Sequence, residues 1–108
     1  MEGLRVEFHP TDITSSGYDW ANINLGIDRV GKARCKIEND VFIIYSINVF
    51  PDYEGQGIGK AFVMESQRQF RKVVADRVRY TAIGFWEKLG FVDNHDGNWV
   101  WTLPDINK

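Results

Sequence analysis

Cysteine is scarce in this sequence, which has one such residue, Cys35, among 108. A single cysteine excludes an intramolecular disulfide framework and a zinc site built from several cysteines. Its scarcity fits a protein that works in the reducing cytoplasm. The two histidines, His9 and His95, have no cysteine or carboxylate partners at metal-ligand spacing. We therefore expect no metal site.

Long apolar runs and a strong net charge are also absent. No apolar stretch approaches the ~18 residues of a membrane span, and residues 1–5 lack the apolar core of a signal peptide. The formal net charge of −2 gives no bulk attraction to nucleic acid or to a membrane surface. We expect a soluble cytoplasmic protein without a membrane partner. The length and the 44% hydrophobic content predict a single globular domain over residues 1–108.

The periodicity of apolar residues predicts alternating strands and helices. Apolar and polar residues alternate over residues 4–8, 20–27 and 30–38, which indicates three strands, with a loop at 11–19 and a turn at 28–31. Residues 41–50 are apolar at most positions, as expected for a central strand covered on both faces. A helical pattern follows over 61–74, then a very short strand at 78–80 and a second helix at 82–89. Residues 91–103 predict a closing hairpin.

A glycine-rich turn joins the strand at 41–50 to the first helix. Such a turn directs backbone N–H groups toward the positive end of the helix dipole, which favours an anion such as phosphate. A nucleotide-binding P-loop would need glycine at Glu54 and a hydroxyl at Ala61. A dinucleotide fingerprint would need glycine at Lys60 or Phe62. Both of these motifs fail on spacing.

Two segments carry a family resemblance. Residues 49–61, VFPDYEGQGIGKA, resemble the acetyl-CoA-binding segment of the GCN5-related N-acetyltransferases (GNAT), where an R/Q-x-x-G-x-G/A turn holds the cofactor pyrophosphate. Residues 82–91, AIGFWEKLGF, resemble the family segment A-x-x-F-Y-E-K-L-G-F, in the family's order and spacing. The resemblance implies an α/β (α+β) fold with a mixed, mostly antiparallel twisted sheet of about six strands and two main helices.

The resemblance also implies where acetyl-CoA would bind. Its pantetheine arm would follow the backbone of Ile47, Asn48 and Val49, with Trp86 near the pantetheine end, whereas Phe85 is interpreted as a core residue. The pyrophosphate would accept hydrogen bonds from the turn and the first helical residues, which are Gly55, Gln56, Gly57, Ile58, Gly59 and Lys60.

Three positions depart from the family pattern. Glu54 stands where Arg or Gln is usual, and Arg79 stands where Asn is frequent, although its guanidinium could reach a CoA phosphate. Trp86 replaces the tyrosine that often protonates the leaving thiolate, and indole cannot serve as that acid. The strand at 41–50 has no carboxylate to act as a base. The catalytic residues are therefore unknown, with Tyr45 and Tyr80 as candidates.

The resemblance implies an N-acetyltransferase that moves an acetyl group from acetyl-CoA to an amine. The region before Trp20 is short, and in the family it usually covers the acceptor site, so an open site would favour a protein lysine or N-terminus. The alternative is a catalytically silent acyl-CoA-binding or protein-interaction module. Exposed aromatic residues in the last strand would suit a homodimer. We interpret the basic residues near the first helix end as solvated rather than as a nucleic-acid site: Arg68, Arg71, Lys72, Arg77 and Arg79.

Overall fold

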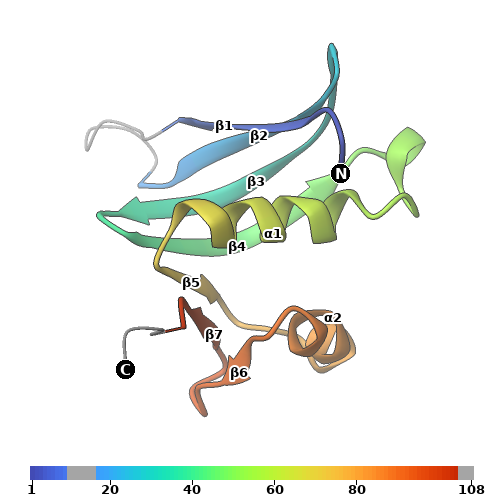
Figure 1. Ribbon diagram of the computed structural model, residues 1–108. Coiled ribbons are helices and arrows are strands. Elements are labelled where there is room, and N and C mark those ends of the chain that lie inside the picture. The colour runs from blue at the N-terminus through green and yellow to red at the C-terminus, as the bar shows by residue number, and fades with distance from the viewer. Residues whose placement is uncertain (10–16, 105–108) are drawn as a thin grey trace.

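The computed structural model describes residues 1–9 and 17–104, which form one seven-stranded sheet with two helices (Figure 1). The sheet order is β1-β2-β3-β4-β5-β7-β6. The β4–β5 pairing is parallel and the other five pairings are antiparallel. The strands are β1 (Leu4–His9), β2 (Asp19–Leu25), β3 (Asp28–Glu38), β4 (Val41–Val49), β5 (Lys72–Ala75), β6 (Val92–Asp93) and β7 (Trp99–Thr102).

Two α-helices and two short 3₁₀ helices complete these elements. They are α1 (Ile58–Gln69), α2 (Ile83–Lys88), η1 (Pro51–Tyr53) and η2 (Tyr80–Ala82). The predicted fold class is confirmed, with one strand more than expected. Neither α-helix in the described part of the chain has the length and apolarity needed to cross a bilayer. Most of the loop predicted at 11–19 lies outside the described residues.

The first predicted helix is too long. Helix α1 ends at Gln69, because Phe70 has an extended backbone with φ −123° and ψ 150°. Val73 and Val74, which the helical pattern included, lie in β5 and pair with Phe42 and Ile43. Valine is β-branched and favours a strand, so sheet pairing prevails over the apolar period. The short strand predicted at 78–80 is also wrong, since η2 begins at Tyr80.

The turn between β2 and β3 lies earlier than predicted. Strand β3 begins at Asp28, and Gly26 and Ile27 form the connection instead of residues 28–31. Gly26 has φ +62°, a left-handed conformation that tight hairpin turns require and that glycine adopts without steric cost. The hairpin therefore forms at the glycine that precedes the predicted turn.

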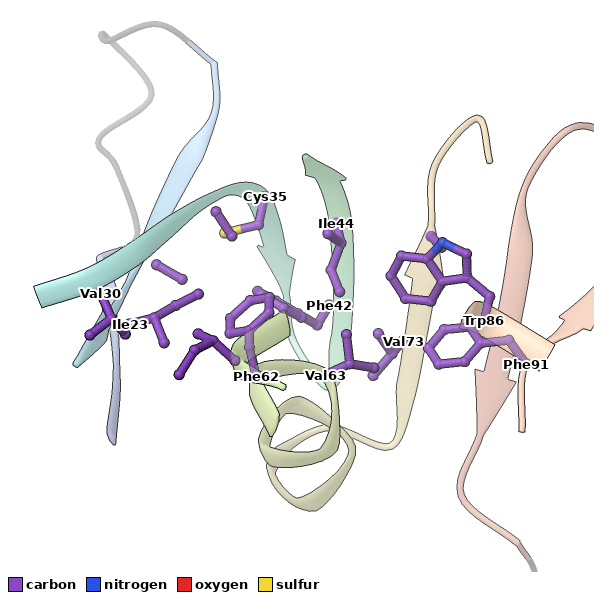
Figure 2. Packing of buried hydrophobic residues seen from close by; sticks show 14 residues of the cluster. Ile23, Val30, Cys35, Phe42, Ile44, Phe62, Val63, Val73, Trp86 and Phe91 are labelled. Carbon is purple, nitrogen blue, oxygen red and sulfur yellow. The ribbon is translucent and has the colours of Figure 1, made fainter. Parts of the chain in front are cut away.

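The core lies on one face of the sheet, where buried residues of both helices form a single cluster (Figure 2). Phe42 of β4 is fully buried, with its ring stacked on Phe70 at a centroid distance of 4.8 Å and edge-on to Phe8 at 5.3 Å. Phe62 of α1 and Trp86 of α2 belong to the same cluster. The expectation that β4 is covered on both faces is therefore wrong. The β4 side chains on the opposite face, Val41, Ile43 and Tyr45, are only half-buried.

The aromatic cluster around Phe42 should dominate the stability of the sheet. We expect Phe42→Ala to lower the free energy of unfolding by about 3–5 kcal/mol, because the lost ring leaves a cavity among Phe8, Phe62 and Phe70. Urea unfolding measures the change. Tyr80→Ala, at a side chain that is 85% exposed, is the matched control and should stay within about 0.5 kcal/mol of the wild type. Equal losses in both variants would contradict the assigned core.

Candidate active site

The sheet opens between β4 and β5. Their parallel pairing covers four residue pairs, from Val41 with Lys72 to Ile44 with Ala75. The Asp76 N–H then donates a final hydrogen bond to the Ile44 carbonyl at 2.9 Å. Strand β4 continues to Val49, whereas the chain after Asp76 leads to η2 and α2. The last part of β4 therefore has one edge without a neighbouring strand.

A β-bulge in β4 lies where this pairing ends. Arg34 of β3 pairs with Ser46 and Cys35 pairs with Ile44, so Tyr45 is the extra residue. Bulges often occur beside active sites, where they change the direction of a side chain or end a pairing. Tyr45 is thus displaced from the regular ladder at the start of the open edge.

The open edge of β4 presents backbone groups of two predicted cofactor-binding residues. The Phe50 N–H donates to the Val30 carbonyl on the β3 side at 2.8 Å. Backbone groups of successive residues in a strand face opposite edges. Ile47 and Val49 therefore direct theirs to the open edge, whereas the backbone groups of Asn48 face β3.

A cleft of about 500 Å³ occupies the opening. Ile47 and Val49 line it from β4, Phe85 and Trp86 line it from α2, and Gly59 lines it from the first turn of α1. This volume lies within the range of small-molecule sites. The cleft thus joins an unpaired strand edge to a helix N-terminus.

The glycine turn has the geometry of an anion site at this helix N-terminus. Gly55 and Gly57 have φ +78° and +80°, and Gly57 is the N-cap of α1 without a side-chain cap hydrogen bond. The first N–H groups of a helix have no acceptor within the helix. They remain available to a ligand together with the helix dipole.

The predicted cofactor residues do not all reach the cleft with their side chains. Ile47, Val49, Gly59 and Trp86 line it. Asn48 is exposed and does not line it. Gly55, Gln56 and Gly57 are exposed in the turn, and the Ile58 side chain is buried in the core. The Lys60 side chain lines a separate cavity beside Met1 and Met64, so it is the backbone N–H of Lys60 that could serve a phosphate.

Both aromatic residues of α2 line the cleft, and Phe85 is more exposed than predicted. Trp86 is 8% exposed and packs edge-on against Phe91 at a centroid distance of 4.9 Å. Phe85, interpreted from the sequence as core, is 37% exposed and lies beside Gly59. The helical pattern could not decide between adjacent positions at the edge of the apolar face. Phe85 is the residue whose ring remains accessible in the cleft.

A second cavity of about 500 Å³ adjoins the cleft. Tyr45, Asp76, Arg77 and Arg79 line both spaces. Residues 41–50 contain no carboxylate, but the fold brings Asp76 beside Tyr45, because Ile44 and Ala75 are paired. Sequence reasoning missed Asp76, and an acidic residue directly after a short apolar strand is the signal that could have identified it.

The two candidate tyrosines are placed very differently. Tyr45 lies at the junction of the two cavities, where burial, then the negative charge of Asp76 and the neighbouring Tyr18, raise the pKa of its phenol. It therefore stays protonated at neutral pH and can donate a proton, but it is a poor base. Tyr80 is 85% exposed at the start of η2, not on a strand, and lines neither cavity.

Comparison with known proteins identifies the family. The family model described as "Acetyltransferase (GNAT) domain" matches residues 20–93. The chain belongs to the GNAT family. The residues that match the GNAT model include the glycine turn and helix α2, as well as Tyr45 and Asp76.

Curated GNAT relatives are similar over part of their length. An uncharacterized N-acetyltransferase of Oceanobacillus iheyensis is 32% identical over 56 residues, which cover 52% of this chain and 34% of the relative. One of Bacillus cereus is 28% identical over 89 residues, covering 81% of this chain and 56% of the relative. The chain thus spans about a third to just over half the length of these relatives.

Solved structures share the GNAT fold at low sequence identity. A GNAT family acetyltransferase from Elizabethkingia anophelis with acetyl-CoA bound gives a TM-score of 0.61 at 14% identity, over 95% of this chain and 100% of that one. A Bacillus subtilis acetyltransferase in complex with CoA gives 0.62 at 12% identity, over 94% of this chain and 99% of that one. At such identities these comparisons establish the fold of this GNAT domain.

The basic residues of the GNAT domain form two separate groups. Arg68, Arg71 and Lys72 lie where α1 leads into β5, and Arg68 forms an exposed ion pair with Glu65 at 3.8 Å. Arg77 and Arg79 lie at the other end of β5 and line both cavities. The first group matches the interpretation of a solvated helix end, and Arg77 and Arg79 are also exposed, although they line the cavities. Among residues 1–9 and 17–104, no three His, Cys, Asp or Glu side chains are grouped to hold a metal ion.

Gly59 allows the anion site to be tested without disturbing the fold. A Cβ at Gly59 would lie 3.9 Å from the Phe85 ring, an ordinary contact, and its φ is not in the left-handed region. We expect Gly59→Ala to keep or raise stability by up to about 1 kcal/mol, yet to weaken acetyl-CoA binding at least about tenfold, because the methyl group would block close approach to the backbone.

Gly84→Ala in α2 is the matched control, since a Cβ there meets nothing within 4 Å and Gly84 does not line the cleft. Thermal melting and calorimetric titration of both variants measure the two effects. Unchanged acetyl-CoA affinity in Gly59→Ala would show that no phosphate lies against the first turn of α1.

Proposed function

We propose that this GNAT domain transfers an acetyl group from acetyl-CoA to an amine acceptor. The observation that carries the proposal is the open edge of β4, which leads along one cleft to the uncapped N-terminus of α1. An unpaired strand edge suits the amide groups of pantetheine, and the helix N-terminus suits a pyrophosphate.

The chain's own groups suggest how the cofactor would be held. Ile47 and Val49 would pair their backbone groups with the pantetheine amides, and the N–H groups of residues 55–60 would bind the pyrophosphate. Glu54 is exposed, so water would screen its carboxylate from that anion. Backbone N–H groups near the Tyr45 bulge would polarise the thioester carbonyl.

The acceptor amine must be neutral when it attacks. Deprotonating a lysine at pH 7 costs about 4.6 kcal/mol, whereas an α-amine costs about 1.1 kcal/mol. Among the described residues that line the two cavities, Asp76 is the one acidic group near Tyr45. Because few groups at the site could remove a proton from the acceptor, we propose a protein N-terminus or another α-amine in preference to the lysine side chain.

Tyr45 is the proposed general acid for the leaving thiolate. It lies where the two cavities meet, and the same surroundings that raise the pKa of its phenol keep it protonated. The residue at the usual tyrosine position, Trp86, is buried in the core and cannot supply the proton. The loss of that tyrosine also favours a second candidate function, a silent acyl-CoA-binding module.

Thermal melting with acetyl-CoA tests the proposal first. At 100-fold over the Kd, binding should stabilise the protein by about 2.7 kcal/mol, which raises the Tm by several degrees in a domain of this size. No shift up to millimolar acetyl-CoA would exclude both the transferase and the silent binder.

Thiol release with a panel of amines then separates the transferase from the silent module. The protein's own thiol should not interfere, because burial and the charge of Asp19 raise the pKa of Cys35 to about 12. A transferase releases CoA only when an acceptor is present. Binding without release for any α-amine or lysine peptide would favour the silent module.

Tyr45→Phe tests the proposed acid. The substitution keeps the ring that contacts Tyr18 at a centroid distance of 5.1 Å but removes the proton. We expect kcat to fall at least about tenfold, with the acetyl-CoA melting shift unchanged. Since the raised pKa of Tyr45 lies above its ordinary value of about 10, its loss of a proton should not lower the wild-type rate between pH 7 and 10. A variant with wild-type kcat would rule out Tyr45.

A further inference from the structure

The cavity beside the cofactor cleft has an unusual charge. Its lining residues are Tyr18, Arg34, Tyr45, Asp76, Arg77 and Arg79, which we call the arginine pocket. Three arginines and one aspartate line it, although the chain as a whole has a net charge of −2. The pocket is therefore a local positive region on a weakly acidic protein.

The three arginines lack protein counter-ions in the part of the chain that the structure describes. No ion pair there involves Arg34, Arg77 or Arg79, whereas Arg29 and Arg68 pair with Glu7 and Glu65. Arginine presents N–H groups in a planar fork that matches a carboxylate. Three such forks lining one cavity make a good site for an anionic ligand.

The three arginines are exposed, but contacts position the Arg34 guanidinium and the backbone that carries Arg77 and Arg79. The Arg34 guanidinium lies 4.8 Å from the centre of the Tyr18 ring, and that ring contacts Tyr45 edge-on. The loop that carries the other two is fixed to the turn after β6, because the Arg77 N–H donates to Asn98 Oδ1 at 2.9 Å and the Val78 N–H donates to the Gly97 carbonyl at 2.9 Å. Arg77 adopts a left-handed backbone with φ +50°, which is uncommon for a residue other than glycine and is maintained by these bonds.

We propose that the arginine pocket selects an acceptor that carries a carboxylate close to its reactive amine. This inference rests on the proposed function and deepens it. Asp76 holds the amine beside Tyr45, and the arginines bind the carboxylate. The acceptor is then an α-amino acid or a peptide with an acidic residue next to its N-terminus, and polyamines or lysine-rich peptides are rejected by like charge.

The proposed transfer needs no reactant other than acetyl-CoA and the amine. The neutral amine nitrogen attacks the thioester carbon, the N–C bond forms and the C–S bond breaks. The amine loses one proton and the thiolate gains one, so the products are an amide and CoA thiol.

Binding to the CoA-loaded protein tests the selection independently of turnover. The probes are the matched C-terminal amides Ala-Glu-Glu-Gly, Ala-Gln-Gln-Gly and Ala-Lys-Lys-Gly, and alanine with alanine amide as the pair of free amino acids. We expect a carboxylate-bearing probe to bind at least about tenfold more tightly than its uncharged partner. The peptide pair and the amino acid pair distinguish the two sources of that carboxylate.

Arg34→Gln should weaken this preference, and Arg34→Glu, which leaves two positive and two negative side chains in the pocket, should abolish it. Arg71→Gln, an exposed arginine at the other end of β5, is the matched control and should keep it. Equal binding within the peptide pair and within the amino acid pair, or an unchanged preference in Arg34→Glu, would overturn the inference. The acetyl-CoA melting shift is read in every variant, because its absence in the wild type would reject the proposed function instead.

Discussion

The parallel pairing of β4 with β5 is the constraint on which the rest of this structure depends. It covers four residue pairs and ends at Ile44 and Ala75. If it continued, a neighbouring strand would satisfy the backbone of Ile47 and Val49, and there would be no cleft. Because it ends early, the chain after β5 turns away into α2 and leaves a strand edge facing a cavity. The same short pairing brings Asp76 beside the Tyr45 bulge.

One face of the sheet carries the apolar core that stabilises the fold, and the opposite face carries polar side chains of the proposed acceptor site. On one face, Phe42, Phe62 and Trp86 form a single apolar cluster that fixes α1 and α2 against the strands. On the other face, Tyr45 is half-buried and Arg34 lies over the Tyr18 ring. Helices on one side free the opposite side for polar side chains, which the arginine pocket uses. The fold thus places the proposed phosphate site, at a helix N-terminus, and the arginine pocket within one small sheet.

The sequence predicted the elements and the glycine turn more reliably than it predicted which residues line the cleft. Glycines at the end of an apolar strand specify a local backbone geometry, so the turn at Gly55 and Gly57 could be predicted from the sequence, whereas its assignment to a cofactor came from the family resemblance. The end of α1 could not, because Val73 and Val74 continue its apolar period and pairing with β4 decides their structure. Asp76 and Arg34 are 42 positions apart in the sequence and meet only through strand order and the bulge at Tyr45.

The most direct test of this account is amide NMR of the labelled protein titrated with acetyl-CoA. The central claim is that the cofactor lies along the open edge of β4 and ends at the first turn of α1. We predict that the N–H signals of Ile47, Val49 and residues 55–60 shift and become protected from exchange, while those of Arg5 and Glu7 in β1 do not change. Saturable binding that leaves Ile47 and Val49 unaffected, or that perturbs instead the cavity beside Met1 and Met64, would contradict it.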